Sequence, residues 1–171
     1  MTNHRKHQRV MGIAPVSRGF GYAILDGDDT LVDWGLKIIE QDKNARVVAH
    51  VSKFMTRYAP NVLLLQDYWA EDSSRGERIK QLGGELIKLA HREGIGTKLL
   101  TRQRVYAAFL GRRKGNKYEI AKLLAARFPE ELAYSLPVNR LFWKSEDARI
   151  AVFEAVALAA AWLRIPRKQL S

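Results

Sequence analysis

Residues 10–25 have the sequence VMGIAPVSRGFGYAIL, in which two short apolar segments flank a turn. Pro15, Ser17 and Gly19 favour a chain reversal between these segments, so the pattern predicts a β-hairpin. Residues 30–39 follow an aspartate-rich turn and resume with β-forming side chains. Three adjacent antiparallel strands are therefore expected at the start of the fold.

The chain beyond these strands alternates between helical and extended patterns. Apolar residues at one-turn spacing predict a helix over residues 44–58, which the side chain of Asn44 would cap. Residues 62–65 are all apolar, as is typical of a central strand covered on both faces. We expect a second long helix over residues 75–92, where two central glycines would allow close packing, and a fifth strand over residues 94–100.

The last third of the chain has mainly helical patterns. We expect a helix over residues 101–110, a basic loop with the sequence GRRKGN over residues 111–116, and a further helix capped by Asn116. Residues 129–143 lack a regular pattern and are expected to be irregular. The final segment, residues 146–163, is apolar on nearly every side and predicts a buried helix.

A single domain accounts for the length of 171 residues. We expect one α/β domain over residues 10–165, between a basic N-terminal tail at residues 1–9 and a C-terminal tail at residues 166–171. The chain has no cysteine, which excludes disulfides, thiolate zinc sites and cysteine nucleophiles. Because we find neither a membrane-spanning apolar stretch nor a signal sequence, we expect a cytoplasmic protein without a membrane partner.

The chain is strongly basic. It has 29 Lys and Arg against 18 Asp and Glu, which gives a formal net charge of +11. Such a charge favours a polyanionic partner, because lysines and arginines that neutralise phosphates release counterions. The histidines show no metal-ligand spacing, and the sequence has neither a Walker-type glycine loop nor a nucleophile elbow. Nucleotide hydrolysis and acyl transfer are therefore not supported.

Four segments, in chain order, resemble motifs of one enzyme family. They are the hairpin at residues 10–25, the strand end at residues 64–66, the segment RRKGNKYEI at residues 112–120 and the segment EAVALAAA at residues 154–161. These segments are similar to those of the RuvC-type Holliday-junction resolvases of the RNase H-like superfamily. The resemblance implies an RNase H-like α/β fold, in which a central five-stranded mixed sheet, three antiparallel strands followed by two parallel ones, is flanked by helices.

The resemblance also implies where a catalytic centre would lie. Nucleases of this family hold two metal ions with carboxylates from the first strand, the fourth strand and the last helix. Two such ions about 3.8 Å apart repel by roughly 17 kcal/mol at an effective dielectric of 20, and clustered acids must offset that repulsion. Here Ala14, Gln66 and Ala151 match three of the acidic positions, and only Glu154 keeps a carboxylate. We therefore expect the two-metal centre to be degraded.

Two further acids are candidates to replace the missing ones. Asp67 directly follows Gln66, but it reaches the same face only if the strand has ended or bulged. Asp147 lies seven residues before Glu154, on the same helix face but about 10.5 Å away along the axis. The candidate catalytic residues are therefore Glu154, Asp147 and Asp67, and the candidate metal ligands are Glu154 and Asp147. In the alternative interpretation, Glu154 is a structural partner of an arginine such as Arg18.

Basic residues cluster where the family approaches DNA. Residues 101–117 contain six basic side chains and no acid. Tyr106 and Phe109 lie among them, either as stacking platforms for bases or as core residues. The candidate nucleic-acid-binding residues are Arg18, Arg75, Arg78, Lys80, Arg102, Arg104, Arg112, Arg113, Lys114 and Lys117.

Three functions are compatible with the sequence. The first is a nucleic-acid-binding protein that resembles RuvC-type resolvases but has a degraded nuclease centre, with DNA (branched DNA included) or RNA as its partner. The second is an active, structure-selective endonuclease that uses Mg²⁺ or Mn²⁺ and a rearranged set of acids; without such activity we expect no cofactor. The third is a non-catalytic module that binds an acidic protein. Because members of the family are commonly dimers, we also expect a homodimer.

Overall fold

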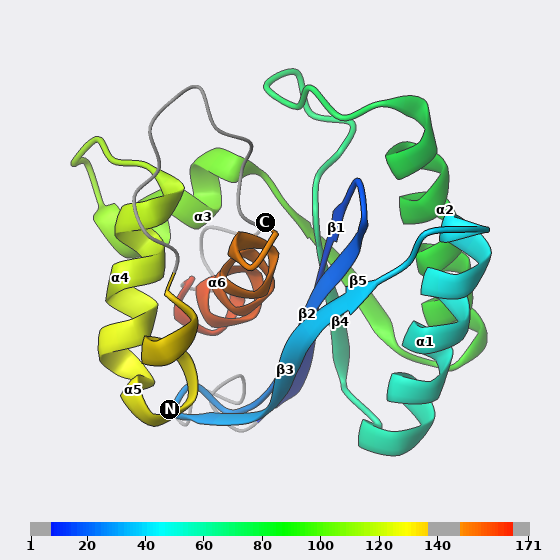
Figure 1. The fold of residues 1–171 in the computed structure, drawn as a ribbon, viewed down its shortest axis with the longest axis horizontal. Helices are drawn as coiled ribbons and strands as arrows, with labels where there is room; N and C mark the ends of the chain where they lie inside the picture. The colour runs from blue at the N-terminus through cyan, green and yellow to red at the C-terminus, as the bar shows by residue number, and fades with distance from the viewer. Residues whose placement is uncertain (1–7, 137–147, 166–171) are drawn as a thin grey trace.

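A five-stranded sheet forms the middle layer of the computed structural model, which describes residues 8–136 and 148–165 (Figure 1). The strand order is β3-β2-β1-β4-β5. The antiparallel strands are β1 (Arg9–Val16), β2 (Gly19–Asp26) and β3 (Thr30–Ile38). The strand β4 (Val62–Gln66) runs parallel to β1, and β5 (Gly96–Leu100) runs parallel to β4. The mixed sheet expected from the sequence is confirmed.

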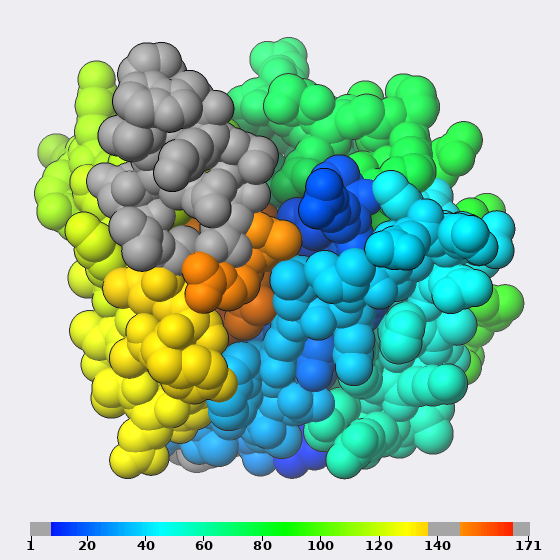
Figure 2. Space-filling model, viewed as in Figure 1, coloured from blue at the N-terminus to red at the C-terminus, as the bar shows by residue number. Residues whose placement is uncertain are grey.

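Helices cover both faces of the sheet (Figure 1). Side chains alternate along β1, so Met11 and Ile13 belong to one apolar core and Val10 and Ala14 to the other. The helices on the Met11 face are α1 (Lys43–Tyr58) and α2 (Glu77–Arg92). The elements on the Ala14 face are α3 (Arg102–Leu110), α4 (Lys117–Arg127), α5 (Pro129–Leu132), the 3₁₀ turn η2 (Ala133–Ser135) and α6 (Ile150–Arg164). In the space-filling view, β3 lies at the surface between these two layers (Figure 2).

The helix α6 lies directly against the backbone of the hairpin. A Cβ atom added to Gly12 of β1 would come within 2.2 Å of the Ala155 carbonyl oxygen. One added to Gly21 of β2 would come within 2.2 Å of the Ala151 carbonyl oxygen. Since Ala151 and Ala155 are four residues apart, both contacts lie on one helix face and set the depth at which α6 crosses the sheet. Only glycine allows so close an approach at these two strand positions.

The burial predicted for the last helix is confirmed. Every residue of α6 is buried except Glu154 and Arg164. The helix begins at Ile150, after a turn at residues 148–149, whereas the predicted start at residues 146–147 lies outside the described residues. Among residues 8–136 and 148–165, no helix has both the length and the hydropathy that crossing a bilayer requires.

The two helix caps predicted from the sequence have different outcomes. Asn116 caps α4 as expected, because its side-chain oxygen accepts hydrogen bonds from two backbone N–H groups of the first turn. The cap predicted at Asn44 is wrong, since α1 begins one residue earlier, after Asp42 in a left-handed conformation. The Asn44 side chain instead bonds with Arg78 of α2, donating to its carbonyl oxygen and accepting from its guanidinium, both at 3.1 Å.

The segment predicted to be irregular is helical in its first half. The short helix α5 and the turn η2 together occupy residues 129–135. Proline fits the first position of a helix because its missing N–H is not needed there, and Pro129 begins α5. Residues 137–143 of the same segment lie outside the described residues.

Candidate functional site

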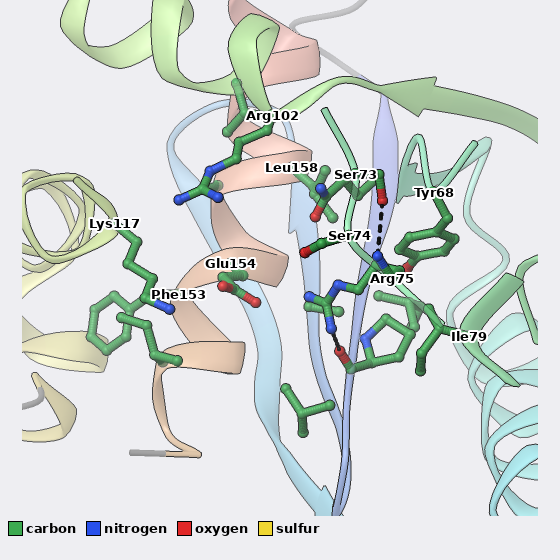
Figure 3. A pocket seen from close by; sticks show the side chains of 18 of the residues that line it. Tyr68, Ser73, Ser74, Arg75, Ile79, Arg102, Lys117, Phe153, Glu154 and Leu158 are labelled. Carbon is green, nitrogen blue, oxygen red and sulfur yellow. Dashed lines mark hydrogen bonds between the residues drawn. The ribbon is translucent and has the colours of Figure 1, made fainter. Parts of the chain in front are cut away.

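A cavity of about 960 Å³ opens where the carboxyl ends of β1 and β4 meet α6, α3 and the loop after β4 (Figure 3). Its position follows from the topology, because parallel strands bring their carboxyl ends to the same edge of a sheet. The charged residues that line it are Arg18, Asp72, Arg75, Arg78, Arg102, Lys117 and Glu154.

Ala14, Gln66 and Glu154 all line this cavity. Gly12 of β1 pairs with Leu64 of β4, and two residues further along each strand the alternation of side chains returns Ala14 and Gln66 to the α6 face. Glu154 precedes the residue whose carbonyl oxygen contacts Gly12. The structure therefore gathers three of the positions that the resemblance assigned to acids, although only one of them carries a carboxylate.

The other predicted acids do not add to this group among the described residues. The backbone N–H of Asp67 donates to the Leu100 carbonyl oxygen at 2.8 Å, and its carboxylate accepts from the Trp69 N–H at 3.1 Å. Asp67 thus shapes the turn after β4 and is absent from the cavity lining. Ala151 is buried and faces the backbone of β2. Asp147 lies outside the described residues.

Two of the predicted arginines are held at the carboxyl end of β1. The Arg75 guanidinium donates to the Pro15 carbonyl oxygen at 3.3 Å, and the Arg78 guanidinium donates to the Val16 carbonyl oxygen at 3.3 Å. The bonds between Arg78 and Asn44 hold the second arginine further. Tertiary hydrogen bonds therefore fix both cations beside the position of Ala14, although sequence spacing gave no sign of such contacts.

Arg102 of α3 and Lys117 of α4 enter the cavity from its other side (Figure 3). The Arg102 guanidinium donates to the Tyr106 hydroxyl at 3.1 Å and lies 5.2 Å from the centre of that ring. This hydrogen bond raises the pKa of Arg102, and the nearby carboxylates of Glu154 and Asp72 raise it further. Arg102 is therefore a permanent cation at the mouth of the site.

The remaining predicted nucleic-acid contacts lie around the cavity. Arg18 occupies the two-residue turn between β1 and β2 and borders the cavity. Arg104 is exposed on α3, and the three basic residues at 112–114 are exposed in the loop before α4. Lys80 is half-buried on α2 and does not line the cavity. The basic surface thus extends from the cavity along α3 and the following loop.

The structure favours the core interpretation of the two aromatic residues in the basic segment. Tyr106 and Phe109 are half-buried and pack against the core of the Ala14 face. The ring of Phe109 is also covered by the Arg164 guanidinium, 4.6 Å from its centre. An aromatic residue that does face solvent close to the cavity is Trp69, which is 47% exposed in the loop after β4.

In this loop, sequence analysis named Asp67 and Arg75 but missed Tyr68 and Asp72. Asp72 lines the cavity with a second carboxylate, and Tyr68 lines it with a buried ring. Residues 67–76 have neither the periodicity of a helix or strand nor a known motif, so the signal for Tyr68 and Asp72 was their place shortly after the fourth strand. Gly83 of α2 helps to seat Tyr68, because a Cβ there would lie 3.0 Å from the tyrosine ring.

The charged lining does not fit a pair of divalent cations. Such a pair needs clustered carboxylates, whereas the described lining holds two, Asp72 and Glu154, against five cationic side chains. Gln66 adds only a neutral amide. In the part of the chain that the structure describes, no three His, Asp or Glu residues are placed to hold a metal ion. The described residues therefore suit an anion better than two cations.

Comparisons with known proteins identify the fold. No family model matches the chain, and no curated protein matches it in sequence. Among solved structures, Thermus thermophilus RuvC has a TM-score of 0.65 at 15% identity, covering 90% of this chain and 92% of its own. The same protein in complex with a Holliday junction substrate has a TM-score of 0.64 at 17% identity, covering 91% and 92%. The yeast mitochondrial Holliday junction resolvase Ydc2 has a TM-score of 0.60 at 16% identity, covering 92% and 78%.

These similarities span nearly the whole chain. They confirm, at the level of the fold, the resemblance that four short motifs indicated. The chain therefore has the RNase H-like fold of the RuvC-type Holliday-junction resolvases.

Proposed function

We propose that the protein binds DNA, with branched DNA as the favoured form, and that its nuclease centre is degraded. The observation that carries the proposal is the cavity at the ends of β1 and β4, where five cationic side chains outnumber two carboxylates among the described residues of the lining. Cations in a concave site attract the phosphate backbone and release its counterions. The T. thermophilus RuvC neighbour is in complex with Holliday junction substrate, and the Fowlpox virus resolvase neighbour is in complex with Holliday junction DNA.

The surroundings of the cavity support a branched substrate. The exposed basic residues at 112–114 and Arg104 extend the positive surface beyond the cavity, which suits contacts to several phosphates. The exposed ring of Trp69 lies at the start of the loop that lines the cavity. Branch points expose unpaired or distorted bases, and an exposed indole ring can stack on them.

Salt dependence of binding tests the proposal. We expect the affinity for a labelled four-way junction to fall at least tenfold between about 50 and about 200 mM salt, and junction to bind more tightly than duplex of the same sequence. Replacing Arg112, Arg113 and Lys114 with glutamine should reduce the salt slope by about 2 to 3. Fluorescence anisotropy measures both quantities.

A matched control variant loses the same number of positive charges on a surface away from the cavity. Lys53, Arg57 and Arg92 are exposed on α1 and α2, whose carboxyl ends lead into β4 and β5 at the edge of the sheet opposite the cavity. Their replacement with glutamine should leave the salt slope unchanged. Equal effects of the two triple variants would show that net charge alone drives binding, and salt-independent binding would contradict the proposal.

The two alternative functions are outcomes of the same experiments. An active endonuclease with rearranged acids would cleave the junction with Mg²⁺ or Mn²⁺, and the Glu154→Gln and Asp147→Asn variants would lose that cleavage. A protein-binding module would show no affinity for any nucleic acid. Sedimentation of the free and junction-bound protein tests the homodimer that we expect.

A further inference from the structure

Tyr68 has a buried hydroxyl without a hydrogen-bond partner among the described residues. The residue is 1% exposed, yet it lines the cavity, and Figure 3 shows its hydroxyl directed toward Arg75. Burying a polar group without a partner costs free energy, so buried polar groups in proteins nearly always have a hydrogen-bond partner, and one without a protein partner is open to a ligand or an ordered water. The position of this hydroxyl therefore indicates that a ligand or a water molecule in the cavity supplies its hydrogen-bond partner.

The chemistry of the missing partner is constrained. Burial raises the pKa of Tyr68 well above its ordinary value; Arg75 acts against this shift, and the Glu154 carboxylate adds to it. The hydroxyl keeps its proton in neutral solution and is available as a donor. A group that accepts a hydrogen bond would therefore satisfy the Tyr68 hydroxyl as a donor.

Charged donors surround the same space. A guanidinium has five N–H groups, and Arg75 uses one of them to bond the Pro15 carbonyl oxygen. Arg102 points into the cavity from α3, with its orientation fixed by Tyr106 (Figure 3). A hydroxyl and two guanidiniums that approach from different directions match the several acceptor oxygens of a phosphate group, and guanidinium–phosphate hydrogen bonds are among the strong ones.

We propose that Tyr68, Arg75 and Arg102 hold one backbone phosphate of bound DNA in the cavity, and that they do so without a divalent cation. This inference rests on the proposed function of DNA binding. It adds which side chains contact the DNA backbone. In the cavity where the resemblance implied metal ions, it assigns the binding of phosphate to arginine side chains.

The first experiment removes single donors. Tyr68→Phe should weaken junction binding about tenfold, which corresponds to the loss of a hydrogen bond to a charged group. The thermal unfolding midpoint should not fall, because the change removes an unpartnered hydroxyl and keeps the buried ring. Arg75→Gln should weaken binding at least as much, and Arg75→Lys, which keeps the charge, should restore part of it.

Matched controls come from exposed residues of the same types. Tyr134 is 73% exposed on η2, and Tyr134→Phe removes a hydroxyl outside the cavity lining. Arg92→Gln removes an exposed guanidinium at the opposite edge of the sheet. Both variants should bind as the unaltered protein does. If Tyr68→Phe also binds unchanged, an ordered water satisfies the hydroxyl and the inference is overturned.

The second experiment tests independence from metal ions. At constant ionic strength, junction affinity should differ less than about twofold between EDTA and Mg²⁺, because fixed side chains supply the positive charge. Affinity that disappears in EDTA would overturn the inference while leaving DNA binding in place. Absence of binding under both conditions would instead contradict the proposed function, so the two failures are distinguishable.

The third experiment identifies the source of the phosphate. Single neutral methylphosphonate linkages are placed in turn along the junction strands near the branch. One position should weaken binding by the unaltered protein more than it weakens binding by Tyr68→Phe, since that variant has already lost one of the three contacts to the phosphate. If no position behaves in this way, or if sub-millimolar inorganic phosphate displaces the junction at constant ionic strength, a backbone phosphate does not occupy the cavity.

Discussion

At the scale of single residues, the neutral side chains of Ala14 and Gln66 define the chemistry of the cavity. Both lie on the face toward α6, and neither brings negative charge to the space beside Arg75. A carboxylate at position 14 would lie next to the Pro15 carbonyl oxygen that holds the guanidinium and would compete for it. Within the cavity lining, these two neutral side chains leave Glu154 as the carboxylate at the positions that the resemblance assigned to acids.

Acids at these two positions should make the cavity more favourable to cations. We expect the double variant Ala14→Asp and Gln66→Glu to bind Mn²⁺ at least tenfold more tightly than the unaltered protein, because it places two carboxylates beside Glu154. The same variant should bind junction DNA more weakly in EDTA. Titration calorimetry measures the first effect and anisotropy the second.

The neutral variant Ala14→Asn is the control for this pair, since it adds a side chain of similar size without charge. It should leave both affinities close to those of the unaltered protein. Unchanged Mn²⁺ affinity in a correctly folded double variant would contradict the prediction. Junction cleavage by the double variant would show that the site lacks only the carboxylates at positions 14 and 66.

At the scale of elements, contact between α6 and the glycines of the hairpin holds the cavity together. Gly12→Ala should lower the free energy of unfolding by about 3 kcal/mol, because the added Cβ would overlap the Ala155 carbonyl oxygen. Gly84→Ala is the matched control, since nothing lies within 4 Å of a Cβ there and the helix α2 gains up to about 1 kcal/mol. The urea midpoint of unfolding should therefore fall for Gly12→Ala and rise for Gly84→Ala. An unchanged midpoint for Gly12→Ala would contradict this account.

The same scale shows which features the sequence could predict. Strands and helices followed from apolar patterning, because burial of those side chains drives their formation, as for residues 62–65 and α6. The helix cap at Asn44 failed because Arg78, distant in sequence, supplies better partners. The cavity residues Tyr68 and Asp72 were missed because their loop has no period, and its shape depends on tertiary contacts.

At the scale of the whole molecule, two apolar cores on opposite faces of one sheet share the task of stabilising the fold. The core under α1 and α2 contains a polar cluster in which Tyr22 and Tyr58 donate hydrogen bonds to the Asp33 carboxylate. Burial raises the pKa of Tyr22 to about 12, and the nearby Asp33 adds to the shift. Because of this cluster, the free energy of unfolding of the whole fold should depend on pH in the alkaline range.

We expect the free energy of unfolding to fall as the pH rises from about 10 to about 12. Tyr22 ionises near its ordinary pKa in the unfolded chain but only near 12 in the folded one, so the unfolded state loses its proton first. The loss amounts to at most about 3 kcal/mol. Urea unfolding at several alkaline pH values should show a shallower pH slope for Tyr22→Phe, and an equal slope would contradict the assignment.

The seating of α6 on bare strand backbone has a consequence for how such proteins diverge. Since main-chain atoms at Gly12 and Gly21 fix how closely α6 approaches the sheet, residues of α6 that face the cavity can change without altering that approach. The packing of α6 on the sheet and the chemistry of the side chains that line the cavity are then set by different residues. The outline of the cavity and the charge of its lining can therefore change independently of each other.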